Sequence, residues 1–256
     1  MRVEQRTKQY EIMAKISVKN GQMIDQDHKA YMGLCQMLFN NELNPGQKIS
    51  YKELAQRINM STTPVIHALK LLEFKGIVRR EPNKGYFVNI ISVKEVEEIF
   101  DSRIALEISL LPKTVKNINK KNISKLDAAL KAHDVAVKSN NNFNRVMTDL
   151  RLHMTLATIS GTNIQVTLLE GLFDRMLLQY SKDLFFVSLI NTSQEEHYAV
   201  FEAVKEKDLD TMTETLTFHL TNTKNRIIQG LQRFLDNNDQ SPTKYYSFED
   251  IKQKAF

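Results

Sequence analysis

Cysteine is almost missing from this chain, since Cys35 is the single one among 256 residues. One cysteine excludes an intramolecular disulfide framework and is typical of proteins from a reducing compartment. Long apolar runs are missing too: the longest cluster, residues 184–190, is far too short to span a bilayer. The N-terminus has no apolar stretch of the kind that secretory signals carry. We therefore expect a cytoplasmic protein with no membrane partner.

Familiar catalytic motifs are also absent. The sequence has no His-Glu-x-x-His pair, no glycine-rich loop of the kind that cradles phosphates, and no nucleophile motif. The apolar share of 42% is ordinary for a globular protein, and the length suits one large domain or two smaller ones. These features argue against an enzyme and for a chain with a well-buried core.

Residues 50–88 have the pattern of two short helices joined by a tight turn and followed by a β-ribbon. A capping box at Ser50 opens the first helix, and Asn59 suits the left-handed residue that ends it. Gly76 ends the second helix, and a turn at 82–85 separates two β-prone runs. This order predicts a winged helix-turn-helix, preceded by one more helix that begins at residue 27 and ends near 41.

A winged helix-turn-helix places the N-terminal part of its second helix in the DNA major groove. Residues 27–90 carry nine Lys or Arg against five Asp or Glu, a basic bias that suits phosphate contact. The same shape can serve as a protein-contact module, but the basic bias and the wing together favour DNA. The residues expected at the DNA are Lys52, Ser61, Thr62, Thr63, His67, Lys70, Arg79, Arg80, Lys84 and Gly85.

Beyond residue 90 no strand pattern appears, and apolar residues recur at helical spacing. A capping box at Ser92 opens a helix that we expect to end before Pro112, because proline interrupts a helix interior. Further helices are expected at 122–139, 142–159, 163–187, 193–206 and 209–235. The predicted fold is mainly α: an N-terminal winged helix-turn-helix and a C-terminal all-α bundle of about six helices, with a seventh left open.

This reading divides the chain into four parts. Residues 1–26 form an N-terminal arm or short extra helix, and 27–90 the winged helix-turn-helix domain. Residues 91–235 form the helical domain, and 236–256 a polar C-terminal tail.

Four residues of the helical domain suit a metal ion. Asp149 and His153 are four residues apart and so project from one face of one helix, whereas His197 and His219 belong to two later helices. A carboxylate and three imidazoles can converge on a divalent cation and leave coordination positions open, although spaced histidines in helices are more commonly structural. Two other histidines are expected at the surface: His28 and His133.

The N-terminal motifs resemble the DNA-binding domain of GntR-family bacterial transcription regulators over residues 28–90. The segments that carry the resemblance are Asn44-Pro-Gly46, Lys52-Glu-Leu-Ala55, Ser61-Thr-Thr-Pro-Val65, Ala68-Leu69 and the glycine-turn wing. Members of that family usually have an arginine at the positions of Thr62 and Ile66 and use both on DNA. Because this chain has neither, the resemblance implies an operator different from the common one.

The helical domain resembles the FCD effector domain of the FadR-type branch over about residues 92–225. The matching segments are Ser102-Arg-Ile-Ala-Leu-Glu107, Asp149-Leu-Arg-Leu-His153, Ser160-Gly-Thr-Asn163, Glu196-His197 and His219-Leu220. The resemblance implies that Asp149, His153, His197 and His219 hold a divalent metal of the zinc, nickel or manganese class. A small carboxylate then binds beside the metal. Arg103 pairs either with that effector or with Glu107 inside the protein.

The function expected from these features is a metabolite-responsive transcription regulator, with repression favoured, that binds operator DNA as a homodimer. One alternative is a regulator with a vestigial pocket that uses the helical bundle only to dimerise. Another is a metal-dependent enzyme with a DNA-targeting domain, for which Glu195 and Glu196 are the nearby candidate bases.

Overall fold

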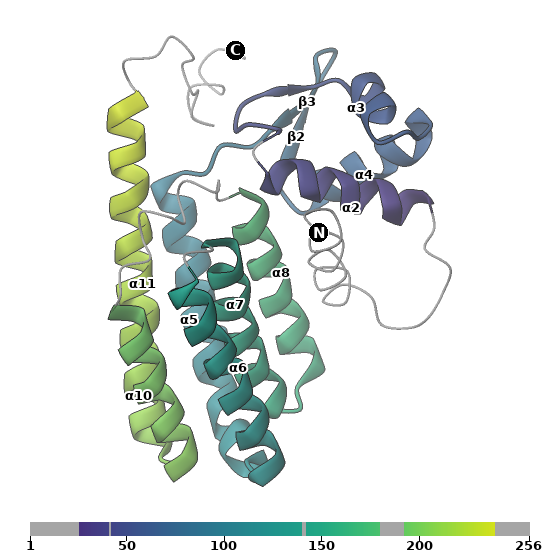
Figure 1. The fold of residues 1–256 in the computed structure, drawn as a ribbon. Helices are drawn as coiled ribbons and strands as arrows, with labels where there is room; N and C mark the ends of the chain where they lie inside the picture. The colour runs from purple at the N-terminus through teal and green to yellow at the C-terminus, as the bar shows by residue number, and fades with distance from the viewer. Residues whose placement is uncertain (1–25, 41, 140–141, 180–191, 239–256) are drawn as a thin grey trace. The chain divides into compact units, whose positions relative to one another are not determined.

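The computed structural model describes residues 26–40, 42–139, 142–179 and 192–238 (Figure 1). Nearly all of the predicted arm and tail lie outside this part, as does the portion of the predicted helix 163–187 beyond residue 179. Within it, no helix is long and apolar enough to cross a membrane. The described residues form two compact units, each described by itself: the first comprises those up to Ile90 together with residues 175–179, and the second comprises the rest.

Before residue 91, the described part of the first unit holds a three-stranded antiparallel sheet with three helices. The sheet order is β1-β3-β2, with Lys48 opposite Phe87 and Arg80 opposite Tyr86. The two-residue strand β1 was not predicted, because so short a run carries no alternation pattern. The elements are α2 (Gln26–Phe39), β1 (Lys48–Ile49), α3 (Tyr51–Arg57), α4 (Thr62–Phe74), β2 (Val78–Glu81) and β3 (Gly85–Val88).

Local signals set the ends of these helices as the sequence predicts. The Oγ atom of Ser50 accepts a hydrogen bond from the backbone N–H of Glu53, so it caps α3. Asn59 and Gly76 have φ angles of 53° and 72°, the left-handed conformation that turns the chain out of α3 and α4. Helix α4 is thereby placed over a core that includes the fully buried Leu69 and Leu72.

The second unit is helical throughout its described residues. Helix α5 packs on α11, α6 on α7, and α10 on α11 (Figure 1). The helices among its described residues are α5 (Val93–Asn117), α6 (Lys120–Lys138), α7 (Asn142–Ile159), α8 (Asn163–Gln179), α10 (Thr192–Glu206) and α11 (Leu209–Asn238). The predicted class, a winged helix-turn-helix followed by an all-α bundle, is confirmed.

Helix α5 corrects one prediction, because it runs through Pro112 to Asn117 instead of ending before the proline. Pro112 lies on the exposed side of the helix, where it removes the hydrogen bond that its own N–H would make and its ring crowds the carbonyl four residues earlier. Leu110, Leu111 and Thr114 are buried on the other side, and the Thr114 hydroxyl donates to the Leu110 carbonyl at 3.0 Å. Burial of this face outweighs the cost of one proline.

Candidate metal centre and DNA-binding surface

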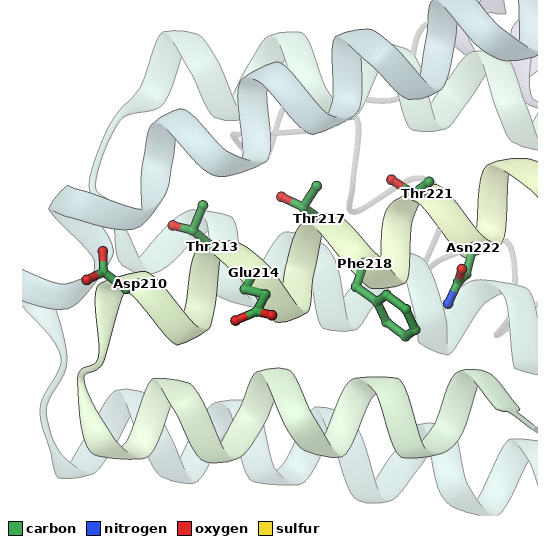
Figure 2. A pocket seen from close by; sticks show the side chains of 7 residues that line it. All are labelled: Asp210, Thr213, Glu214, Thr217, Phe218, Thr221 and Asn222. Atoms are coloured by element: carbon green, nitrogen blue, oxygen red, sulfur yellow. The ribbon is translucent and has the colours of Figure 1, made fainter.

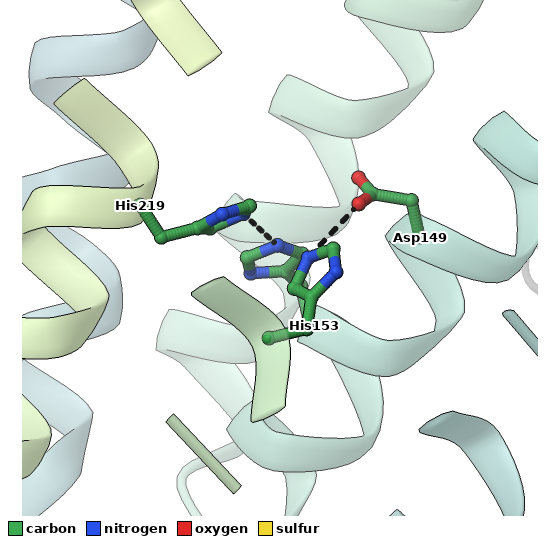
Figure 3. Close-up of side chains that lie close together, drawn as sticks. Asp149, His153 and His219 are labelled. Carbon is green, nitrogen blue, oxygen red and sulfur yellow. Dashed lines mark hydrogen bonds and ion pairs between the residues drawn. The ribbon is translucent and has the colours of Figure 1, made fainter. Parts of the chain in front are cut away.

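Three helices bring the four predicted metal residues together inside the bundle. Asp149 and His153 come from successive turns of α7, His197 from α10 and His219 from α11. One ligand atom from each residue lies within 4.8 Å of all the others (Figure 3). The three histidines are buried, whereas Asp149 is partly exposed.

Two buried carboxylates determine which ring nitrogen carries the hydrogen in two of these histidines. Glu107 Oε2 lies 2.7 Å from Nδ1 of His153, and Glu196 Oε2 lies 2.8 Å from Nδ1 of His219. Burial alone would raise the pKa of both carboxyls, but His153 and Arg103 around Glu107, and His219 and Arg226 around Glu196, lower each to about 2. An ionised carboxylate only accepts hydrogen bonds, so each Nδ1 must donate.

The opposite ring nitrogens of the same two histidines face each other. Nε2 of His153 and Nε2 of His219 are 3.2 Å apart (Figure 3). Because Nδ1 carries the hydrogen in each neutral ring, both Nε2 atoms present lone pairs. Burial and repulsion from His197 lower the pKa of His219 to about 3, which disfavours a proton between the rings. Two facing lone pairs are an arrangement that a shared metal cation stabilises.

His197 and Asp149 complete the group of four candidate metal ligands. Nε2 of His197 lies 3.1 Å from Oδ1 of Asp149, and the His197 and His219 ring centroids are 4.3 Å apart. Attraction to the surrounding histidines outweighs burial and holds the pKa of Asp149 well below its usual value. One anionic oxygen therefore accompanies the three imidazoles, a donor set that suits a divalent transition metal.

Each supporting carboxylate is neutralised by an arginine. Nε of Arg103 donates to Glu107 Oε1 at 3.0 Å, and this guanidinium is nearly fully buried between two aromatic rings. Arg226 makes two parallel bonds to Glu196, at 3.0 and 2.9 Å. Both acids are thus fixed and compensated before any ligand is considered. For Arg103 this is the internal pairing expected as the alternative to an effector contact.

His133 is not at the surface as predicted, because its side chain is fully buried. Nδ1 of His133 lies 3.1 Å from the Thr148 hydroxyl, and its ring stands edge-on to His197 with centroids 4.9 Å apart. Burial lowers its pKa to about 4. The helical spacing of Leu126, Ala129, Leu130, His133 and Ala136 could have placed it on the buried face.

A surface hollow elsewhere on the second unit is distinct from this centre. All seven residues that line it come from one helix, α11 (Figure 2). They include none of the four predicted metal residues. They are Asp210, Thr213, Glu214, Thr217, Phe218, Thr221 and Asn222.

In the first unit, most residues expected at the DNA are exposed. These are Lys52, Ser61, Thr62, Thr63, Lys70, Arg80 and Lys84, and Gly85 has a φ of 98° in the wing turn. The other two have partners inside the unit. Nδ1 of His67 lies 2.8 Å from an Asp27 oxygen, and Arg79 donates to the Val88 carbonyl at 3.1 Å while its guanidinium stacks on Phe87.

Comparisons with known proteins match both units. Residues 27–88 match the model for bacterial regulatory proteins of the gntR family, and 98–222 match the FCD domain model. The regulator YdhC of Bacillus subtilis is 25% identical over 74% of this chain and 85% of its own length. The transcriptional repressor RspR of Escherichia coli is 24% identical over 69% of this chain and 77% of its own.

Among solved structures, McbR/YncC of Escherichia coli superposes with a TM-score of 0.68 at 20% identity, over 83% of this chain and all of that one. This likeness supports the fold. The two family matches show that the chain belongs to the GntR family of bacterial transcription regulators and carries an FCD domain behind its winged DNA-binding domain.

Proposed function

We propose that this regulator binds operator DNA as a homodimer and that its FCD domain holds a divalent metal ion with Asp149, His153, His197 and His219. A small carboxylate effector binds beside the metal. The observation that carries the metal is the pair of Nε2 atoms, 3.2 Å apart, whose partner nitrogens are committed to Glu107 and Glu196.

The donor set narrows the choice of metal. Three imidazoles and one carboxylate suit the zinc, nickel or manganese class better than calcium or magnesium, which prefer oxygen ligands. Four protein ligands leave one or two positions open on an ion that accepts five or six, so an effector carboxylate can bind there. A bound metal would supply positive charge and an open coordination position.

Metal content tests this proposal directly. Protein purified without chelator should contain close to one divalent ion per chain by elemental analysis, and a His153→Ala/His197→Ala double variant should contain almost none. His67→Ala is the matched control, because this histidine is exposed and lies in the other unit. Wild-type protein without metal, or a double variant with full metal content, would contradict the proposal.

The DNA-binding part of the proposal rests on the exposed start of α4 and the wing. Ser61, Thr62 and Thr63 are exposed there, and Thr62 and Ile66 stand where most family members have arginines. Recognition then depends on short hydroxyl donors and on phosphate contacts from Lys52, Lys70, Arg80 and Lys84. A two-fold operator pairs with a homodimer. Footprinting on the native promoter should give a half-site different from the common family one, with weaker binding by Thr62→Ala.

Repression is the favoured mode, in keeping with the relative RspR, which is a transcriptional repressor. An effector changes DNA affinity only as far as it binds the two arrangements of the dimer with different affinity. Gel-shift titrations with and without organic acids measure that difference. A DNA affinity that no acid changes would favour the alternative in which the bundle only dimerises.

The enzyme alternative gains no support from the side chains around the centre. Glu196, a candidate general base, is occupied by His219, Asn222 and Arg226. The family and the named relatives are DNA-binding regulators.

A further inference from the structure

We infer that the effector is a hydroxy acid whose carboxylate pairs with Arg145 and whose hydroxyl donates to Nε2 of His133. This inference rests on the proposed function and deepens it. It assigns two residues outside the four proposed ligands to the ligand, and it names the chemical class of that ligand.

Arg145 lies one helical turn before Asp149 on α7 and has two side-chain nitrogens without a hydrogen-bond acceptor among the described residues. Its Nε and Nη2 atoms are buried and have no hydrogen-bond partner within the described residues. Burial and repulsion from Arg226 lower its pKa, against the attraction of Asp149, and the influence of Asp149 places Arg145 within electrostatic reach of the proposed centre. Buried guanidinium nitrogens without an acceptor are costly, and a carboxylate is the acceptor that fits the planar fork of an arginine.

Charge balance around the centre points the same way. Glu107 is matched by Arg103, and Glu196 by Arg226, so neither acid is left for Arg145. Asp149 offsets only part of the charge of a divalent ion. With Arg145 included, the centre keeps a net positive charge that an anionic ligand would neutralise.

His133 adds a hydrogen-bond acceptor, and the Thr148 hydroxyl determines which ring nitrogen it is. That hydroxyl lies 2.7 and 3.0 Å from the carbonyls of Asn144 and Arg145, where its single hydrogen is used. Toward His133 it can therefore only accept, so Nδ1 of His133 carries the hydrogen. Nε2 is left as a buried lone pair, without a donor among the described residues.

The two unfilled requirements lie close together on neighbouring helices. Helix α6 packs on α7 and on α10, which places His133 beside His197 and within the influence of Asp149 and Arg145. Arg145 requires a negatively charged hydrogen-bond acceptor, and Nε2 of His133 requires a neutral hydrogen-bond donor. A carboxylate and a hydroxyl on one small molecule meet both, whereas a simple carboxylic acid leaves His133 unsatisfied.

Pairs of acids that differ by one hydroxyl test this on the zinc-loaded, full-length protein. Calorimetric titration compares lactate with propionate and malate with succinate. We expect the hydroxy acid of at least one pair to bind about tenfold tighter or more, as loss of one buried hydrogen bond implies. Equal affinity within both pairs, or no binding by any of the four acids, would overturn the inference.

Two variants assign the preference to the residues. His133→Asn keeps an amide N–H for Thr148 but lacks Nε2, so it should lose the hydroxy-acid preference while its affinity for the plain acid stays. Arg145→Gln should weaken both members of a pair about tenfold or more. Arg151→Gln, an exposed arginine of the same helix, is the matched control and should bind as wild type. Full preference in His133→Asn, or unchanged binding in Arg145→Gln, would contradict the assignment.

A spectroscopic measurement covers the case in which His133→Asn does not fold. In wild-type protein labelled with ¹⁵N-histidine, Nδ1 of His133 should be protonated, and its Nε2 resonance should shift when the hydroxy acid binds. A protonated Nε2, or a resonance that the acid leaves unmoved, would overturn the inference. Metal content separates failure of the proposed function from failure of this inference. Protein that binds no zinc contradicts the proposed function. Protein that binds zinc but shows no preference for hydroxy acids, and no effect of His133 or Arg145, contradicts only the inference.

Discussion

At the scale of single residues, Glu107 holds two partners in the buried centre. One oxygen accepts from Arg103 and the other from His153, and its side chain is 3% exposed. Removal of its charge would take from the buried Arg103 guanidinium the counter-ion that Glu107 provides, which is far more costly than loss of a surface pair. Its contribution to stability therefore differs in kind from that of the exposed acids on the same helix.

We predict that Glu107→Gln lowers the free energy of unfolding of the metal-free protein by about 3 kcal/mol, as loss of one partner of a buried ion pair typically does. Urea denaturation followed by circular dichroism measures it. Glu98→Gln is the matched control on α5, since its pair with Lys94 is exposed and spans 3.9 Å. That control should change stability by less than about 0.5 kcal/mol. Equal effects of the two substitutions would refute the argument.

The neighbouring wing residues Arg79 and Arg80 differ in what they can do for DNA. Arg80 is exposed, whereas Arg79 is tied to the Val88 carbonyl and to Glu81. We predict that Arg80→Ala weakens DNA binding on all sequences and reduces the salt dependence of the binding constant by about one ion. Arg79→Ala should instead lower thermal stability. Fluorescence anisotropy across a salt series, with melting curves of both variants, checks this; a reversed pattern would contradict it.

Some residues of the buried centre can be predicted from the sequence, and others cannot. Asp149 and His153 could be paired from their spacing, because four residues make about one helical turn. The contact between Glu107 and His153 spans 46 positions and depends on how α5 packs on α7, which spacing within one helix does not encode. The same holds for His133, whose burial follows from packing and not from its own polarity.

At the scale of elements, two serines begin helices in different ways. Ser92 Oγ accepts from the backbone N–H of Glu95 at 3.1 Å and caps α5. Ser61 precedes α4 with extended backbone angles, but its side chain makes no capping hydrogen bond. The Ser61 hydroxyl is thus exposed and not engaged in the helix, which fits its proposed role on DNA.

The two serines lead to opposite predictions. Ser92→Ala should lower the free energy of unfolding by about 1 kcal/mol, because a backbone donor at the start of α5 loses its acceptor. Ser61→Ala should change the free energy of unfolding by only about a few tenths of a kcal/mol, because no capping hydrogen bond is lost, but it should weaken operator binding. Denaturation and gel-shift titrations of the two variants test the pair. A Ser61→Ala variant as destabilised as Ser92→Ala, with unchanged DNA affinity, would show that Ser61 acts only as a cap.

Helix α5 shows a case in which local sequence rules predict the start of a helix but not its end. Its start follows from the capping box at Ser92, but the proline rule places its end too early, before Pro112. That rule weighs one missing hydrogen bond and one steric clash. It does not weigh the buried face formed by Leu110, Leu111 and Thr114, which exists only once the bundle has packed. Element ends set by local capping are predictable, whereas those set by tertiary packing are not.

At the scale of the whole molecule, the order of a winged unit and a helical unit could be predicted because hydrophobic periodicity changes at residue 90. The convergence of three helices on one centre could be inferred only through the family resemblance. In the structure, α7, α10 and α11 are separated in sequence yet supply atoms within 4.8 Å of one another. A metal at this point would tie these helices together.

Metal removal should therefore lower the stability of the helical unit. Three mutually close buried histidines lose their shared cation, and a ligand that binds only the folded state stabilises it by about 4 kcal/mol at a free concentration 1,000 times its dissociation constant. We predict that a chelator lowers the melting temperature of wild-type protein and that added zinc restores it. The His153→Ala/His197→Ala variant should melt at one temperature with or without chelator. Chelator-independent melting of zinc-loaded wild type would show that the centre does not couple metal binding to folding.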